Sequence, residues 1–125
     1  MVFWEKNRAV SLIFTILFVI EIYHFSSITG GVGGGNVWVA RSYHFIVFFL
    51  FSFFSMATIK GKTKLKRKYI LIVLTLSIIQ AILDETHQIF VPFRDASIQD
   101  VLTDTLGIFS SIIFYVCTQS KKTKL

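Results

Sequence analysis

The chain has 125 residues, of which 54% are hydrophobic and 14 are phenylalanine, and its mean hydropathy is +0.67. This composition excludes an ordinary water-soluble domain and is typical of one small integral membrane protein. The formal net charge of +6 would raise the question of nucleic acid in a soluble protein. Here the basic residues stand in short runs beside apolar segments, which favours a role in membrane orientation and gives no reason to expect a nucleic-acid partner.

Four apolar segments predict four membrane-spanning helices, at about residues 9–25, 38–59, 69–88 and 99–118. A helix rises about 1.5 Å per residue, so about 20 residues are needed to cross a hydrocarbon core of about 30 Å. Each segment reaches this length only with its polar end included, which places those polar ends at or just inside the interface. The predicted fold is therefore all-α, a single domain of residues 1–125 that forms an up-down-up-down four-helix bundle in the membrane.

The basic residues predict how the bundle is oriented. They precede the first segment, form a cluster after the second and follow the fourth, as Lys6, Arg8, Lys60, Lys62, Lys64, Lys66, Arg67, Lys68, Lys121, Lys122 and Lys124. Cytoplasmic loops of membrane proteins carry an excess of Lys and Arg, so we expect both termini to be cytoplasmic. The cluster after the second segment is interpreted as a solvated inner loop close to anionic lipid headgroups.

With this orientation, the remaining ionisable residues gather at the outer ends of the four helices. They are Glu21, His24, Arg41, His44, Asp84, Glu85, His87, Asp100 and Asp104. Arg94 and Asp95 fall in the outer loop between the third and fourth helices, while Glu5 alone of the seven acids is on the inner side. The sequence therefore predicts a bundle with an apolar inner half and a charged outer half.

The densest polar stretch of the chain spans the end of the third helix and the start of the fourth. Helical spacing puts Asp84 and Glu85 within reach of Gln88 on one face, and it puts Asp100 one turn from Asp104. Ionisable residues inside membrane-spanning helices are costly and usually face the bundle interior, although some near the interface extend into water instead. We expect these side chains to point inward.

Arg94 and His44 add further ionisable groups to this stretch. The planar fork of Arg94 can bind a carboxylate. An ion pair with Glu85, Asp100 or Asp104 would offset the burial of that acid and clasp the third and fourth helices together. Spacing alone leaves this structural role and a functional one open. His44 is either a proton acceptor or cluster partner, or an ordinary hydrogen-bonded residue near the interface.

Other kinds of site find less support in the sequence. No His-x3-His pair is present, and the close set Asp84, Glu85 and His87 offers one histidine, so no metal or other cofactor is expected. No serine has an identifiable base at a fixed spacing. The five glycines between the first two helices predict a flexible loop without a phosphate-binding motif. The phenylalanine run of the second helix is interpreted as lipid-facing and packing surface.

The same stretch resembles the signature of the VanZ-like family of small bacterial membrane proteins. The matching elements are Asp84-Glu85-x-x-Gln88-x-Phe90-x-Pro92-x-Arg94 followed by Asp100 and Gly107, then Tyr43-His44-Phe45 with Arg41 three residues before the histidine, and Phe25-Ser26-Ser27. The resemblance spans about residues 12–115. Asparagine is usual in the family at the position of Asp104, and tyrosine is frequent near Phe48. Either burial keeps the Asp104 carboxyl group neutral, or Arg94 or Arg41 compensates its charge.

The resemblance implies a multi-pass protein of the bacterial plasma membrane. The founding member of the family is associated with low-level resistance to teicoplanin, a glycopeptide antibiotic that carries a fatty acyl chain, and the resemblance supplies no reaction. We therefore expect a cell-envelope protein whose outward-facing pocket binds a lipid headgroup or an amphiphile, with the phenylalanine-rich helix against the acyl part. The expected binding residues are Arg94, Gln88, Asp84, Asp104 and Arg41.

A membrane-embedded enzyme that acts on a lipid-linked envelope substrate is the alternative. Glu85 or Asp100 would serve as general acid or base with His44 as partner, because carboxyl groups in a half-buried cluster can suit that role. Proton-coupled transport has weaker support, because the inner half offers no matching relay of ionisable groups. The sequence leaves binding and catalysis open.

Overall fold

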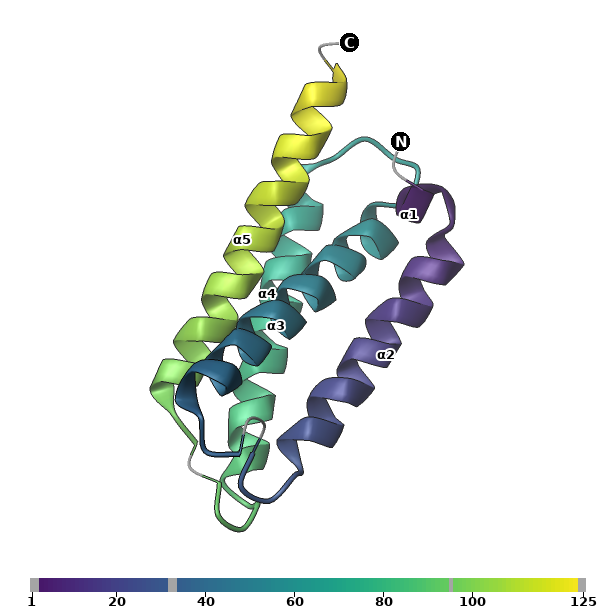
Figure 1. Ribbon diagram of the computed structural model, residues 1–125. Helices are drawn as coiled ribbons and strands as arrows, with labels where there is room; N and C mark the ends of the chain where they lie inside the picture. The colour runs from purple at the N-terminus through teal and green to yellow at the C-terminus, as the bar shows by residue number, and fades with distance from the viewer. Residues whose placement is uncertain (1–2, 32–33, 95, 124–125) are drawn as a thin grey trace.

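The computed structural model describes residues 3–31, 34–94 and 96–123, and these residues form helices joined by short loops (Figure 1). The helices are α1 (Phe3–Lys6), α2 (Arg8–Ser26), α3 (Val37–Lys60), α4 (Arg67–Gln88) and α5 (Ile98–Thr123). The four long helices begin and end within two residues of the predicted segments, except that α5 continues to Thr123. The all-α fold is therefore confirmed. Asp95 and Lys124, for which the sequence predicted positions in the outer loop and the inner tail, lie outside the described residues.

Four helices, α2 to α5, are long and apolar enough to cross a membrane. Their most apolar windows have mean hydropathies of 1.9, 1.7, 1.6 and 1.6 in chain order. Large apolar side chains cover the outside of the bundle, for example Ile13, Ile20, Leu76, Leu83 and Phe114. Such a surface is unfavourable in water but is the normal exterior of helices surrounded by lipid tails. The chain is thus a multi-pass membrane protein.

Successive long helices run in opposite directions, so both ends of the chain lie at the same end of the bundle (Figure 1). Helix α3 packs against α2, α4 and α5, and half of its most apolar stretch is buried. Its phenylalanines Phe48, Phe51 and Phe54 are buried in the core, while Phe49 and Phe53 lie near Phe114 of α5. The three buried phenylalanines are therefore packing surface, as expected for part of the run.

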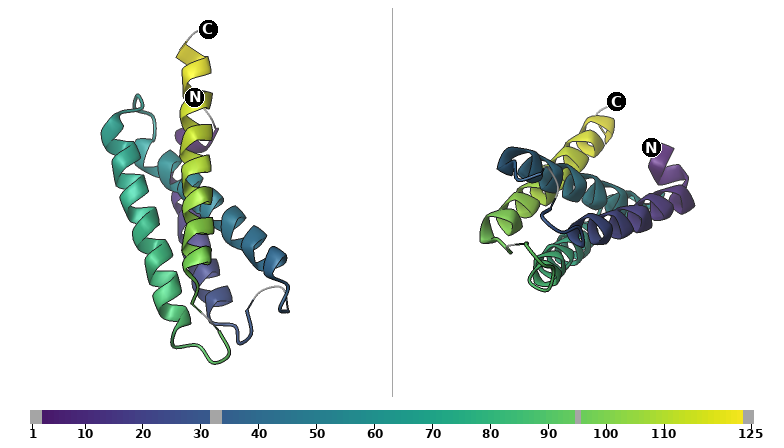
Figure 2. Two further views of the ribbon diagram at one scale, coloured as in Figure 1. Left: turned by 90° about the vertical axis from the view of Figure 1, so that its left-hand side faces the viewer. Right: turned by 60° about the horizontal axis from the view of Figure 1, so that its bottom comes forward.

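Helices α3 and α5 cross in close contact (Figure 2). Gly107 of α5 faces Phe45 of α3. Gly107 is buried, and a Cβ atom placed on it would overlap the backbone carbonyl oxygen of Phe45. Small residues at helix crossings in membranes allow backbones to approach in this way. The crossing positions Asp104, one turn before Gly107, opposite His44, the residue preceding Phe45.

The end of the bundle that carries the termini holds a buried polar group. Helix α1 places Glu5 there with no exposed surface, and the Lys60 Nζ atom lies 3.2 Å from its Oε2 atom. The Tyr115 hydroxyl donates a hydrogen bond of 2.7 Å to Glu5 Oε1, and the side-chain amide of Gln119 also donates to that oxygen. We call these four residues the inner cluster.

The inner cluster corrects two predictions. The inner half is not uniformly apolar, and Lys60 is only 4% exposed although it was assigned to a solvated loop. The physical reason is that α1 packs against α3 and delivers Glu5 to Lys60, a contact between distant positions that no local spacing reveals. Buried apolar residues, among them Phe48 and Phe51, occupy the core between this cluster and the opposite end.

Candidate functional site

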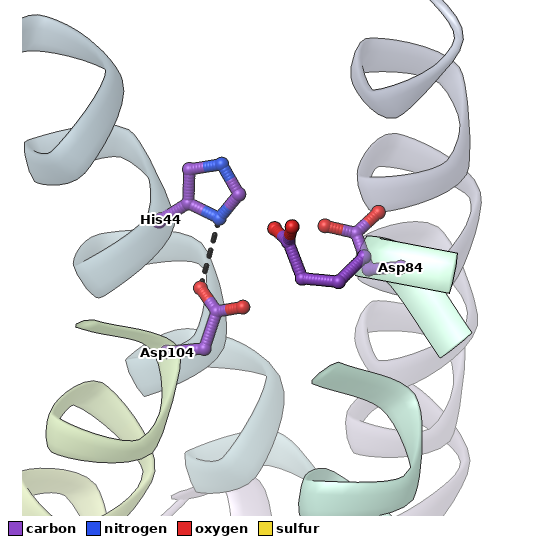
Figure 3. A group of neighbouring side chains, drawn as sticks. His44, Asp84 and Asp104 are labelled. Atoms are coloured by element: carbon purple, nitrogen blue, oxygen red, sulfur yellow. Dashed lines mark hydrogen bonds and ion pairs between the residues drawn. The ribbon is translucent and has the colours of Figure 1, made fainter. Parts of the chain in front are cut away.

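Four ionisable side chains from three helices meet at the end of the bundle opposite the termini. They are His44 of α3, Asp84 and Glu85 of α4, and Asp104 of α5, and we call them the acidic cluster. One ligand-type atom from each lies within 4.8 Å of those from the others. Figure 3 shows Asp84 facing His44 and Asp104 across the helix interface. All four side chains are buried, with Asp104 fully inaccessible.

Each member of the acidic cluster is held by a specific contact. His44 Nδ1 and Asp104 Oδ1 are 2.9 Å apart (Figure 3). The side-chain amide of Gln88 donates to Asp84 Oδ2 at 3.0 Å. The backbone N–H of Ser97 donates to Glu85 Oε2 at 2.8 Å, immediately before α5 begins. The contact of His44 with Asp104 joins α3 to α5, and the contact of Ser97 with Glu85 joins the residue before α5 to the end of α4, so the cluster links the three helices through the start of α5.

Three carboxylate oxygens of the cluster accept no hydrogen bond of ordinary geometry among the described residues, and the Ser26 hydroxyl, which also makes none, lies near Asp84. The three oxygens are Asp84 Oδ1, Glu85 Oε1 and Asp104 Oδ2, and each is inaccessible to solvent. Buried polar atoms are nearly always hydrogen-bonded, because an unmade bond costs about 1–3 kcal/mol, and more for a charged group. Three such atoms in one small volume therefore require a physical explanation.

A hollow of about 220 Å³ opens beside the acidic cluster, and we call it the outer pocket. Its walls include Gly31, Asn36, His44, Gln88, Arg94 and Asp100. Asn36 also caps α3, because its side chain accepts hydrogen bonds from the N–H groups of Trp38 and Val39. His44 and Gln88 belong both to the pocket wall and to the contacts of the acidic cluster. The pocket thus borders the acidic cluster through His44 and Gln88.

Arg94 does not clasp the helices as the sequence suggested. Among the described residues, ion pairs within 4.0 Å are formed by His44 with Asp104 and by Lys60 with Glu5. The guanidinium of Arg94 lies instead against Gly31 on the wall of the outer pocket. The predicted pairs are not formed because His44 contacts Asp104 across the Gly107 crossing, while a backbone N–H binds Glu85.

His44 also accounts for the carboxyl group at position 104. The family pattern has asparagine there, and the sequence left Arg94 or Arg41 as possible compensating cations. In the structure the imidazole of His44 is the group that contacts Asp104, at 2.9 Å. A carboxylate can hold that ring in one orientation, which is the usual effect of a carboxylate on histidine.

The other predicted residues lie around the acidic cluster rather than in it. Asp100 is partly exposed on the pocket wall. Arg41 points elsewhere, because it hydrogen-bonds the side chain of Gln99 and stacks on Trp38, with its guanidinium carbon 5.7 Å from the ring centroid. His87 contacts the Ser27 hydroxyl at 2.9 Å. Arg41 and Arg94 are therefore not brought together into one anion site.

The glycine-rich loop is a part of the site that sequence reasoning missed. Gly30, Gly31 and Gly35 line the outer pocket, although the loop was predicted only as a flexible connection. Gly31 has a φ of +76°, and a Cβ atom on it would lie 2.5 Å from Nη1 of Arg94. The run of glycines was a usable signal, because glycine allows both positive φ and close approach of a side chain to the backbone.

Replacing Gly31 with alanine is expected to displace Arg94 from the wall of the outer pocket without unfolding the bundle. The matched control is Gly34→Ala, because Gly34 also has a positive φ, of +57°, but a Cβ atom there meets nothing within 4 Å. In both variants an alanine must adopt a positive φ, so both carry the same kind of backbone strain. A difference between the two variants therefore reports the clash of the Gly31→Ala side chain with Arg94. Modification of Arg94 by an arginine-specific reagent, compared between the two purified variants at equal helix content, measures this difference. Equal modification would contradict the contact between Gly31 and Arg94.

The protein has four membrane-spanning helices, a buried ionisable cluster and a polar pocket at one end of the bundle. It is therefore a small multi-pass membrane protein with a polar site. A family model described as VanZ/LLP1 matches residues 23–119, which is most of the chain. The chain belongs to the VanZ/LLP1 family, and the resemblance read from its motif is confirmed. Searches of curated proteins and of solved structures gave no match. The matched range contains the acidic cluster and the outer pocket, and it leaves out α1.

Proposed function

We propose that this protein sits in the bacterial plasma membrane with both termini in the cytoplasm and binds the headgroup of a lipid or another amphiphile in its outer pocket. Through this binding it contributes to resistance against glycopeptides of the teicoplanin type. Membership of the VanZ/LLP1 family and the membrane-spanning bundle support the general assignment. The position of Arg94 on the pocket wall is the observation that carries the proposal.

Arg94 gives the pocket its preference for an anionic group. The residue has no carboxylate within 4.0 Å among the described residues, so a phosphate or carboxylate of a ligand would supply its counter-charge. Guanidinium groups bind such anions through two parallel hydrogen bonds. His44 and Gln88 line the same pocket and can form hydrogen bonds to the rest of a headgroup.

The size of the pocket favours a headgroup over a whole amphiphile. Sites that enclose drug-sized ligands have volumes of about 300–1,000 Å³, whereas the outer pocket has about 220 Å³. An acyl chain would therefore lie outside it, against the apolar helix surface. A groove of about 470 Å³ lies between α2 and α4, where Ile20, Leu83 and Asp84 line it. This groove can hold the acyl chain better than the phenylalanines of α3, three of which are buried.

The charge distribution supports an outward-facing pocket. The basic residues Lys6, Arg8, Lys62 and Lys66 lie at the end of the bundle that carries the termini. The loop after α2 and the loop after α4 lie at the other end (Figure 1). Residues of both loops line the pocket. Because basic residues favour the cytoplasmic side, the pocket faces the outer leaflet in this orientation.

The proposal is tested with Arg94→Ala, using Arg67→Ala at the opposite end of α4 as the matched control. Hydrogen bonds to charged groups contribute about 1.5–3 kcal/mol. Arg94→Ala is therefore expected to weaken binding of anionic lipid in nanodiscs by about 10- to 100-fold. The variant should also abolish any teicoplanin resistance that the expressed wild-type protein confers. If lipid binding and resistance are the same in the folded Arg94→Ala protein as in wild type, the proposal is wrong.

The pair formed by His44 and Asp104 favours a second candidate, an enzyme that acts on a lipid-linked envelope substrate. A carboxylate that orients an imidazole beside a pocket is a common arrangement for general acid–base catalysis, and Glu85 lies in the same cluster. Glu85→Gln separates the two candidates, because a catalytic carboxylate cannot be replaced by an amide, whereas a binding residue retains much of its function. Turnover of a lipid-linked precursor by wild type and its loss in Glu85→Gln would favour the enzyme. Absence of turnover by wild type, with or without divalent metal, would exclude it.

A further inference from the structure

The acidic cluster has the geometry of a cation site. One atom each from His44, Asp84, Glu85 and Asp104 lies within 4.8 Å of the others, and the four residues come from three different helices. Metal–ligand bonds of about 2.0–2.6 Å place ligands on opposite sides of a divalent cation about 4–5 Å apart. A single ion between these atoms would therefore need little movement of the side chains.

The hydrogen bonds of the three carboxyl groups are a second, independent indication of a cation site. Asp84, Glu85 and Asp104 are each at most 6% exposed, and each has one carboxylate oxygen without a hydrogen-bond partner among the described residues. The second oxygen of each is held in place, by Gln88, by the backbone N–H of Ser97 and by His44 respectively. Hydrogen bonds of this kind commonly orient ligands around a metal. Each of the three carboxyl groups thus combines one oxygen held by a hydrogen bond with one that has no hydrogen bond, within a group whose ligand-type atoms lie close together.

The charge of the cluster also calls for a cation. Three carboxyl groups face one imidazole in a buried region of a membrane protein, where uncompensated charge is costly. The ion pairs of the described residues offer one cation to the cluster, His44, because Lys60 is paired with Glu5 in the inner cluster. A divalent ion would compensate the remaining carboxylates and coordinate their free oxygens together.

We propose that His44, Asp84, Glu85 and Asp104 bind one divalent metal ion of the Mn²⁺ or Zn²⁺ class. Imidazole favours transition metals and carboxylates favour Mg²⁺, Ca²⁺ and Mn²⁺, so the mixed set selects ions that accept both kinds of ligand. His44 is on the wall of the outer pocket, so the proposed ion site borders a hollow that opens to the surface. A metal was not expected from the sequence because it contains no helical histidine pair, whereas these ligands converge from separate helices.

The test is a titration of the full-length protein in detergent, stripped with a chelator, with Mn²⁺ alone. The electron paramagnetic resonance signal of free Mn²⁺ reports binding, and Zn²⁺ is added in competition. We expect about one ion per chain and a rise in the unfolding temperature with added Mn²⁺. Asp84→Asn and Asp104→Asn should each lower the affinity at least about 10-fold. These isosteric variants also relieve carboxylate repulsion, so they should fold.

Two control variants make the result specific. Asp100→Asn changes an acid one turn from Asp104 that is not in the cluster, and His24→Gln changes an exposed histidine, so both should bind Mn²⁺ as wild type does. Arg94→Ala should also retain Mn²⁺ binding, which separates this proposal from the proposed function. Wild-type protein that binds neither Mn²⁺ nor Zn²⁺ would overturn the proposal. Equal affinity in wild type, Asp84→Asn and Asp104→Asn would overturn it as well.

Discussion

Gly107→Ala is expected to destabilise the protein by about 1–3 kcal/mol, the usual cost of adding atoms to a fully packed site. A Cβ atom on Gly107 would fall on the backbone carbonyl of Phe45, and a backbone cannot rotate away as a flexible side chain can. Helices α3 and α5 would have to separate. Unfolding in detergent mixtures, followed by circular dichroism, measures the change in the free energy of unfolding.

Separation of these helices should also affect the acidic cluster. His44 precedes Phe45, and Asp104 lies one turn from Gly107, so the 2.9 Å contact between His44 and Asp104 depends on the crossing. Leu106→Ala is the control, because Leu106 is on the same helix but is 62% exposed. Equal stability of Gly107→Ala and wild type would show that α3 and α5 do not meet as described.

Lys60→Met is expected to have the other large effect, because it removes the cation from the buried pair with Glu5. Breaking a buried ion pair on one side costs about 3–5 kcal/mol, since the other charge stays buried. Tyr115 and Gln119 still donate hydrogen bonds to Glu5, which places the expected loss at the lower end of that range. Lys62→Met is the control, because Lys62 is exposed two residues later. The free energy of unfolding is again the measurement.

A double variant distinguishes loss of the ion pair from loss of packing. When Glu5→Gln is combined with Lys60→Met, no charge remains buried at this site, and much of the stability should return. Two residues in direct contact are expected to show such non-additive effects. Additive losses in the double variant would mean that Glu5 and Lys60 contribute independently, contrary to the 3.2 Å contact between them.

The helices could be predicted from the sequence because each consists of a long apolar stretch bounded by polar or glycine-rich residues. Length and hydropathy alone locate such segments, since the lipid core sets a minimum span. The grouping of polar residues at one end followed from antiparallel connectivity, which places His44, Asp84 and Asp104 at the same level of the bundle. Hydrophobic periodicity was less informative, because helices surrounded by lipid are apolar on most sides.

The pairings within the site could not be predicted. Spacing showed that Arg94 was near several acids, but the partner of each acid depends on which helices touch. Gly107 brings His44 to Asp104, and the start of α5 presents the Ser97 N–H to Glu85. These contacts join positions that are far apart in the sequence. They provide other partners for Asp104 and Glu85, and the guanidinium of Arg94 lies on the pocket wall instead.

The inner cluster was missed for a related reason. Glu5 was recognised as the only acid on the inner side, yet its four-residue helix was too short to register as an element. Lys60 was grouped with the basic residues that follow it, because all of them stand between two apolar segments. The structure shows instead that Lys60 is the last residue of α3 and is paired with Glu5 of α1, whereas Lys62, Lys64 and Lys66 lie in the loop before α4.

The central claim is that ionisable side chains from three helices form one buried cluster beside a pocket that binds an amphiphile headgroup. A density map of the protein in a nanodisc of bacterial lipid tests this most directly. We expect His44, Asp84, Glu85 and Asp104 to be in mutual contact, with headgroup density between Arg94 and His44. A map in which these side chains point separately into lipid or water, with no headgroup in the pocket, would contradict the account.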